Sequence, residues 1–443
     1  MNVLNRSFRT IALCGFVGLV LTVTTSARAE NWAQWRGPAF NGTSPETGLP
    51  EKFSKTEHVA WVCALGGESA ATPIIWEDRV FVTSHDQETK EIQAICVNRK
   101  DGKIRWKKAI GLAMNKASPT GKNTYASPSP VTDGEHVWFI TGTGEVAAFD
   151  MEGTPLWSKN LPKEYGPLAY LHGYSSSPLL LDKKLYIQYF RRKHSEKPGE
   201  PLPPKPFESY LICLDGISGK EVWKQVREGQ AKDGAHEAYT TPIPYQNNGK
   251  TEILALGANA LTAHDPATGK EIWRYGHLIN LQDSRLCASP LICNNVICVG
   301  ESQRNETVGI RPGGSGDLPP EYMLWKYAEF PANVPTPTFY NGLIYTVDHL
   351  KKTLSCLKPD TGERVWANNL GITGEIAASP TAADGKIYIL SEAGDVLVIG
   401  LQPEFKILNN IQLDDGGITT ASIAVAYKHL FIRSAKNLYC IGD

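Results

Sequence analysis

Short apolar runs separated by turn residues recur along the whole chain and predict β-strands. Runs such as 184–187 (Lys-Leu-Tyr-Ile) and 342–346 (Gly-Leu-Ile-Tyr-Thr) are rich in aliphatic and aromatic residues, and a further run such as 354–357 follows them. A helical repeat protein would place its apolar residues with a period of 3.6 residues, which these short runs do not follow. We therefore expect an all-β fold made of many short strands.

A Ser/Thr-Pro pair opens an apolar strand at regular positions and marks a repeated unit. Proline has no backbone N–H to donate to a sheet, so it suits the first residue of a strand. Successive pairs are 43 to 64 residues apart, a spacing typical of the blades of a β-propeller. The pairs are Thr72-Pro73, Ser129-Pro130, Ser177-Pro178, Thr241-Pro242, Ser289-Pro290, Thr336-Pro337 and Ser379-Pro380, with Ser422-Ile423 as a degenerate eighth copy.

A turn that contains glycine and leads into a strand with tryptophan is the second repeated element. Glycine permits the positive φ of a tight hairpin, and we expect the tryptophan to pack between adjacent blades. Regular copies end at Trp106, Trp157, Trp223, Trp273 and Trp366, whereas Trp61 and Trp325 fit less regularly and Phe405 takes this place in the last copy.

The two ends of the chain complement each other. A lone tryptophan strand, 59–62, precedes the first unit, and the last unit, 423–442, supplies only three strands. Pairing of the two ends would complete the last blade and remove exposed sheet edges. The sequence therefore predicts an eight-bladed β-propeller of four-stranded antiparallel blades over residues 57–443, after an extended segment at 30–56. A seven-bladed ring is the alternative if the degenerate copy is not a blade.

Residues 1–29 have the features of a signal peptide. Arg6 and Arg9 precede an apolar run at 11–23, and the segment ends in a small-residue site that predicts cleavage after Ala29. No other run approaches the roughly 20 apolar residues that a membrane span needs. Removal of the segment takes away three arginines and no acid, which changes the net charge from −1 to about −4. We expect a periplasmic or secreted monomer that binds no nucleic acid.

Eight cysteines remain after removal of residues 1–29, in a compartment that permits disulfides. Cys96, Cys213 and Cys356 each lie ten residues before the tryptophan of their unit, and an alanine holds the same place in another copy. A position that accepts either residue is typical of a small core side chain. Cys63 and Cys440 are the pair whose strands ring closure would bring together. No Cys/His spacing indicates zinc or haem, and we predict no metal site.

The Ser/Thr-Pro opening, the Asp-x-x-x-Gly-x-x-x-Trp ending and the eight copies resemble the propeller repeat of pyrroloquinoline-quinone (PQQ) proteins. This family includes quinoprotein alcohol dehydrogenases and BamB-type outer-membrane assembly factors. Residues 32–38 (Trp-Ala-Gln-Trp-Arg-Gly-Pro) and 45–49 are similar to the start of many secreted bacterial members. For a dehydrogenase the resemblance implies PQQ with calcium, an Asp base and a disulfide between adjacent cysteines. No Cys-Cys pair occurs in this sequence.

The loops just before the Ser/Thr-Pro pairs carry many polar and aromatic residues. In a propeller these loops surround the mouth of the central channel, a concave place that favours ligand binding. The alternative is that equivalent loops carry similar residues only because the copies descend from one unit. The candidate funnel residues are Tyr125, His172, Tyr174, His236, Glu237, Tyr239, Arg285, Asn333 and Glu375, together with Asn123 and Asp283.

Two insertions extend this surface. Residues 193–208 contain five prolines and predict a stiff extended loop. Residues 311–317 are rich in glycine and predict a long hairpin connection, in which Asp317 is a candidate cation ligand.

Two classes of function remain open at this stage. The first is a binding platform without catalysis, for a small ligand in the funnel or for a protein of the cell envelope. The second is a PQQ-dependent or related oxidoreductase. A weaker third hypothesis is carbohydrate binding or processing, for which the aromatic residues would offer stacking surfaces. No catalytic motif is present, which does not exclude an enzyme. Because the Cys-Cys pair is missing and the polar loops would form a concave site, we favour the binding platform.

Overall fold

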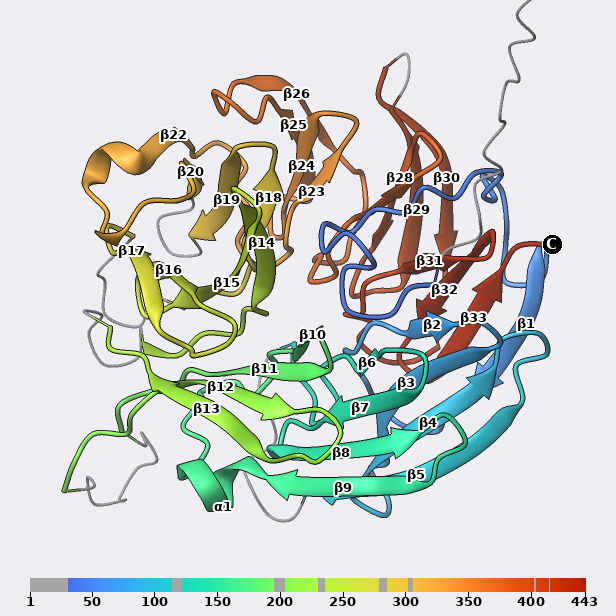
Figure 1. The fold of residues 1–443 in the computed structure, drawn as a ribbon. Coiled ribbons are helices and arrows are strands. Elements are labelled where there is room, and N and C mark those ends of the chain that lie inside the picture. Colours follow the sequence, from blue (N-terminus) through green and yellow to red (C-terminus); the bar gives the residue numbers. More distant parts are fainter. Residues whose placement is uncertain are drawn as a thin grey trace, which may run out of the picture.

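The computed structural model describes residues 31–113, 122–194, 204–229, 236–278, 285–301, 306–401, 404–413 and 415–443. These residues form eight sheets of antiparallel strands around a central axis, so the predicted eight-bladed β-propeller is confirmed (Figure 1). The proposed signal peptide, Asp283 and residues 195–203 of the proline-rich insertion lie outside the described residues. Within the described ranges, no helix is long and apolar enough to span a bilayer.

The first four blades follow one another in sequence. Blade 1 comprises β2 (Ile74–Trp76), β3 (Arg79–His85), β4 (Glu91–Asn98) and β5 (Ile104–Leu112). Blade 2 comprises β6 (Val131–Thr132), β7 (His136–Ile140), β8 (Glu145–Asp150) and β9 (Pro155–Asn160), and α1 (Leu161–Tyr165) follows it. Blade 3 comprises β10 (Leu179–Leu181), β11 (Lys184–Tyr189), β12 (Tyr210–Asp215) and β13 (Glu221–Val226). Blade 4 comprises β14 (Ile243–Asn247), β15 (Lys250–Gly257), β16 (Ala260–His264) and β17 (Glu271–Tyr275).

The other four blades complete the ring. Blade 5 comprises β18 (Leu291–Cys293), β19 (Val296–Glu301), β20 (Glu306–Ile310) and β22 (Met323–Tyr327), with the 3₁₀ helix η2 (Pro320–Tyr322) before β22. Blade 6 comprises β23 (Thr338–Tyr340), β24 (Leu343–Asp348), β25 (Thr353–Leu357) and β26 (Arg364–Asn369). Blade 7 comprises β27 (Thr381–Ala383), β28 (Lys386–Leu390), β29 (Asp395–Gly400) and β30 (Lys406–Gln412). Blade 8 comprises β31 (Ala424–Ala426), β32 (His429–Arg433), β33 (Asn437–Ile441) and β1 (Val59–Ala64).

Blade 8 closes the ring as the sequence predicts, because β1 pairs with β33 from the other end of the chain (Figure 1). In this register Trp61 lies opposite Cys440, whereas Cys63 lies opposite Leu438. The two cysteines are therefore offset, and both are free thiols. His58 Nδ1 and Asp443 Oδ1 form a hydrogen bond of 2.7 Å beside the closing strands.

The tryptophans pack between adjacent blades, as the repeat pattern predicts. In five copies the indole Nε1 donates to a backbone carbonyl in the turn of the next blade, and the turn glycine lies against the ring. At Gly219, for example, an added Cβ would lie 2.6 Å from the Trp157 ring. Glycine is thus required for both its positive φ and its lack of a side chain. The donors are Trp61, Trp106, Trp157, Trp223 and Trp325, at 2.7 to 3.1 Å from their acceptors.

The glycine-rich insertion of residues 311–317 changes this contact at blade 4. It forms a short strand, β21 (Gly316–Asp317), which pairs in parallel with β17 at Trp273 and Arg274. Trp273 is fully buried and donates instead to Glu252 of its own blade, at 2.8 Å. The insertion is therefore more than the predicted hairpin connection, because it adds a fifth strand to the outer edge of the preceding blade.

The segment before β1 crosses from blade to blade at one end of the channel. Trp32 pairs with Ile75 of blade 1, and Ser44 donates to Ala382 of blade 7 at 3.0 Å. Glu46 accepts backbone bonds from Tyr427 and Lys428 in blade 8, at 2.9 and 3.1 Å. The extended segment is therefore an integral part of the propeller.

Candidate functional site

A cavity of about 420 Å³ lies where the innermost strands begin, and loops from all eight blades line it. This volume falls within the range of small-molecule sites. Seven of its lining residues are the Ser/Thr side chains that open the innermost strands, from Ser129 to Ser422. Each innermost strand begins two residues after its Ser/Thr, so the repeat itself places the hydroxyls around the channel.

These hydroxyls form a ring of hydrogen bonds from blade to blade, which we call the hydroxyl ring. In seven of the eight anchors the backbone N–H donates to the hydroxyl oxygen of the anchor in the next blade, as Thr72 does to Ser129 at 2.9 Å, whereas the Thr72 hydroxyl has no partner among the described residues. The last bond of the series runs from Ser379 to Ser422, which confirms Ser422 as the eighth anchor. The accepting residues are Ser129, Ser177, Thr241, Ser289, Thr336, Ser379 and Ser422, at 2.8 to 3.2 Å.

Trp35 forms the floor of the cavity. It lines both the cavity and a smaller space behind it, so the indole separates the two. The next residue, Arg36, is 2% exposed and donates to the carbonyls of Pro380 at 2.7 Å and Pro337 at 2.8 Å. Burial lowers the pKa of Arg36 to about 9, which still leaves the guanidinium charged near neutral pH. The segment 32–38 thereby closes one end of the channel.

The rim on blades 2 to 5 is a connected polar network. Asn123 donates to the backbone carbonyl of His172 at 3.1 Å, and the backbone N–H of His172 donates to the Tyr239 hydroxyl at 3.1 Å. Arg285, which lines the cavity, donates to the buried Glu237 at 3.0 Å. Burial raises the pKa of Glu237, although the Leu171 N–H and two arginines oppose this shift.

Lys122 connects blade 2 to the opposite side of the rim. Its ammonium pairs with Glu375 at 2.5 Å and with Glu392, both in blade 7. Burial lowers the pKa of Lys122, but its two carboxylate partners outweigh this effect and hold the pKa above its usual value. The hydrogen bond from Lys122 in turn lowers the pKa of Glu375. His349 also lines the cavity, and burial followed by the charge of Lys122 lowers its pKa.

Only part of the candidate set from the sequence reaches the cavity. Four of the predicted funnel residues line it, namely His172, Tyr239, Arg285 and Asn333, as does neighbouring Asn123. Glu237 is fully buried behind Arg285, and Glu375 stands beside Lys122 rather than in the lining.

Three other candidates are buried side chains that do not line the cavity. Tyr125 packs edge-on against His85 at a centroid distance of 5.1 Å. Tyr174 is 1% exposed and packs against Tyr170 at 5.5 Å, and His236 is 5% exposed. His172 and His236 are equivalent in sequence but differ in environment, because only His172 faces the channel.

Several lining residues were not singled out from the sequence as site residues. Trp35, Lys122, His349 and Cys287 have no spacing that marks them, since each depends on contacts between distant blades. Burial raises the pKa of Cys287 to about 12, so its thiol stays protonated near neutral pH.

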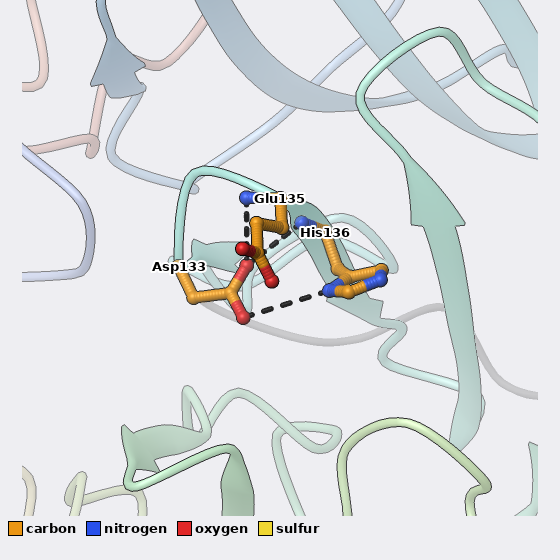
Figure 2. Close-up of side chains that lie close together, drawn as sticks. All are labelled: Asp133, Glu135 and His136. Atoms are coloured by element: carbon orange, nitrogen blue, oxygen red, sulfur yellow. Dashed lines mark hydrogen bonds and ion pairs between the residues drawn. The ribbon is translucent and has the colours of Figure 1, made fainter.

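Among the residues that the structure describes, one cluster of potential metal ligands occurs, away from the cavity at the turn between β6 and β7 (Figure 2). The ligand atoms of Asp133, Glu135 and His136 lie within 4.8 Å of one another. Asp133 Oδ1 accepts the backbone N–H bonds of the other two residues at 2.9 and 2.7 Å, as is typical of a turn. Glu135 pairs with Lys183 at 3.0 Å. Turn formation and this ion pair explain the cluster.

Comparison with known proteins assigns the family. The family model described as outer membrane protein assembly factor BamB matches residues 51–193 and 208–318, more than half of the chain. The chain belongs to this family. No curated protein matches it.

Solved structures agree with the fold of this BamB-like chain. BamB from Moraxella catarrhalis is 14% identical, with a TM-score of 0.57 over 86% of this chain and 96% of that one. The quinohemoprotein alcohol dehydrogenase from Comamonas testosteroni is 10% identical, with a TM-score of 0.65 over 93% of this chain and 80% of that one. Identities this low establish the shared propeller fold alone.

The quinone cofactor of the dehydrogenases does not fit the described lining. Calcium takes oxygen ligands and usually includes carboxylates among them. None of the described lining residues is Asp or Glu, and the nearby Glu237 and Glu375 are engaged by Arg285 and Lys122. The sequence also lacks the Cys-Cys pair that the resemblance to the dehydrogenases implies.

Proposed function

We propose that this protein is a binding platform of the cell envelope that holds a small ligand in its central cavity. The observation that carries this proposal is the closed-ended cavity itself, with a tryptophan floor, a wall of hydroxyls and a polar rim. Such a concave site with a few convergent polar groups suits small-molecule binding. The segment 1–29 supports export to the periplasm or the medium.

Catalysis is not required by this arrangement. The lining offers no carboxylate base among its described residues, and burial keeps the Cys287 thiol protonated. The face around the cavity mouth has a second candidate role, the binding of a protein partner. The likeness to BamB supports this role, since that protein is an assembly factor by name. A rim occupied by a partner and a cavity occupied by a ligand are compatible.

A ligand-capture experiment tests the proposal. The full-length protein, expressed with export in a bacterial host, would be purified and denatured, and the released small molecules identified by mass spectrometry. Ala377→Phe should empty the cavity because Ala377 lines it. Ala109→Phe is the matched control, since Ala109 is exposed on the outer strand β5.

We expect a compound that is retained by the wild type and by Ala109→Phe but lost in Ala377→Phe. If the wild type and Ala377→Phe release the same compounds, and no added metabolite shifts the melting temperature of the wild type alone, the ligand-binding role is wrong. Capture of a protein that survives Ala377→Phe would instead support the rim as the functional surface.

A further inference from the structure

Two adjacent residues, Lys122 and Asn123, contact opposite sides of the propeller. Both lie in the connection that leads into blade 2, and both line the cavity. The Lys122 ammonium pairs with Glu375 and Glu392 of blade 7. The Asn123 amide donates to the carbonyl of His172, in the connection that leads into blade 3. Blades 3 and 7 are four places apart in a ring of eight, so they stand opposite each other. We call the side chains of residues 122 and 123, with these partners, the crossbar.

The crossbar lies at the open end of the cavity. The other end is closed by the segment 32–38, and the floor residue Trp35 shares the smaller space behind it with Pro178 and Pro242. These prolines follow their Ser/Thr anchors along the chain, whereas Lys122 and Asn123 come before theirs. The hydroxyl ring therefore separates the floor from the crossbar. A molecule that enters the cavity from solvent has to pass the crossbar.

The contacts of the crossbar are of a kind that breaks and forms again readily. The side chains of Lys122, Glu375 and Glu392 are 26%, 45% and 16% exposed, so water and salt reach this group of charges. Ion pairs near a protein surface are weak and are screened by salt. The Thr420 hydroxyl adds a long bond of 3.4 Å to the Lys122 carbonyl. No backbone–backbone bond joins Lys122 or Asn123 to another described residue. Side chains alone therefore hold the crossbar across the mouth.

We infer that the crossbar is a gate, which opens the cavity to solvent when the Lys122 side chain leaves Glu375 and Glu392. Release allows the long Lys122 side chain to turn into water, whereas the bond from Asn123 to His172 keeps the other half of the crossbar in place. The gate goes beyond the proposed ligand-binding role, because it acts on any molecule that is too large to pass the closed crossbar. Its operation can be measured without knowledge of the ligand.

Cys287 offers a built-in reporter of access to the cavity. Its side chain lines the cavity, whereas the other seven described cysteines are buried in the blades. Burial raises the pKa of Cys287 to about 12, so its thiol reacts slowly, and the charges that act on it are those of Arg285 and Glu237. N-methylmaleimide and N-phenylmaleimide carry the same uncharged reactive group and differ in size. The ratio of their rates at one thiol therefore reports the width of the path, independently of the reactivity of the thiol.

Lys122→Met tests the gate, because it keeps an unbranched side chain and removes the charge. Peptide mass spectrometry would follow the modification of Cys287 over time. We expect N-phenylmaleimide to react about tenfold faster than in the wild type, because the two ion pairs that hold the closed state are lost, and N-methylmaleimide to gain less. Molar sodium chloride should accelerate the wild type and leave Lys122→Met unchanged, because salt screens ion pairs. Lys183→Met is the matched control, since it removes a pair with Glu135 at 3.0 Å outside the cavity lining and should change neither rate.

A second variant keeps the test decisive if Lys122→Met lowers the stability of the fold. Glu375→Gln combined with Glu392→Gln removes the same ion pairs from the other side and should give the same acceleration at Cys287. Equal rates of N-phenylmaleimide in the wild type and the gate variants, including no reaction in any of them, would overturn the gate. The same acceleration of both maleimides would also overturn it. Neither result affects the capture experiment with Ala377→Phe, so the gate and the ligand-binding role can fail separately.

Discussion

Trp223 offers a sharp test of how the blades are held together. Its indole is 9% exposed on β13 of blade 3 and packs against Tyr186 at a centroid distance of 5.8 Å. Across the interface it lies on Gly269 of blade 4, where an added Cβ would come within 2.4 Å of the ring. Its Nε1 donates to the carbonyl of Pro266 at 3.0 Å. Trp223→Ala therefore removes the packing and the hydrogen bond of one interface.

The expected loss follows from these contacts. Truncation of a buried tryptophan to alanine costs about 3 to 5 kcal/mol, because a cavity remains that the rigid blades cannot fill. Trp223→Phe keeps most of the buried ring and loses the bond to Pro266, for about 1 to 2 kcal/mol. An unfolding entropy of about 2.1 cal/mol/K per residue, over roughly 400 residues, converts 4 kcal/mol into a fall of about 5 °C in melting temperature.

Differential scanning calorimetry of the two variants measures these shifts. Val222→Ala is the control, since Val222 neighbours Trp223 on the same strand and is 44% exposed. We expect the order wild type, Val222→Ala, Trp223→Phe and Trp223→Ala, from most to least stable. If Trp223→Ala melts together with Val222→Ala, the indole does not join the blades and the packing argument is wrong.

Three further predictions concern single positions. Gly219→Ala places a Cβ 2.6 Å from Trp157 and should lower the melting temperature by several degrees. Gly249→Ala has a similar φ with open space around it, so it should cost only about 1 kcal/mol of stability. Equal shifts of the two variants in thermal melts would contradict the steric explanation. Burial lowers the pKa of His264 to about 4. Below pH 6.5 the unfolded chain therefore binds a proton at His264 that the folded chain does not bind. The free energy of unfolding should fall by up to about 3 kcal/mol between pH 6.5 and 4. Urea unfolding at each pH measures this fall, which should be smaller in His264→Gln. His236→Ala should destabilise the protein by about 2 kcal/mol, because His236 is 5% exposed. His172→Ala should cost under about 1 kcal/mol, because His172 lies at the cavity. The reverse order in urea unfolding would show that His236 is not the more buried of the two in solution.

The repeat made the fold readable from the sequence. Every innermost strand begins directly after its anchor pair, from β2 after Pro73 to β31 after Ile423, because proline suits a strand start. What the pattern did not disclose is why serine or threonine precedes it. The hydroxyl serves as an acceptor for the neighbouring blade, and this role appears only when the blades stand side by side.

The site was less accessible to sequence reasoning, because its parts meet over long separations. Arg36 bonds to residues 301 to 344 positions away, and Lys122 pairs with residues 253 and 270 positions away. No local spacing can mark such contacts. Equivalence in the repeat also predicted one environment for His172 and His236, which was wrong. His172 lines the channel, whereas His236 is buried outside its lining.

The pairing of β1 with β33 fixes the order in which the molecule can assemble. Until Ile441 has been made, Val59 has no partner strand, so β1 must wait for the last blade although Trp32, earlier in the chain, already has its partner in blade 1. Contacts of such sequence separation form slowly and leave strand edges exposed in the meantime. A chain that lacks its last few residues would therefore leave β1 without a partner strand, and the ring of blades would stay open. Closure of the propeller thus depends on an intact C-terminus.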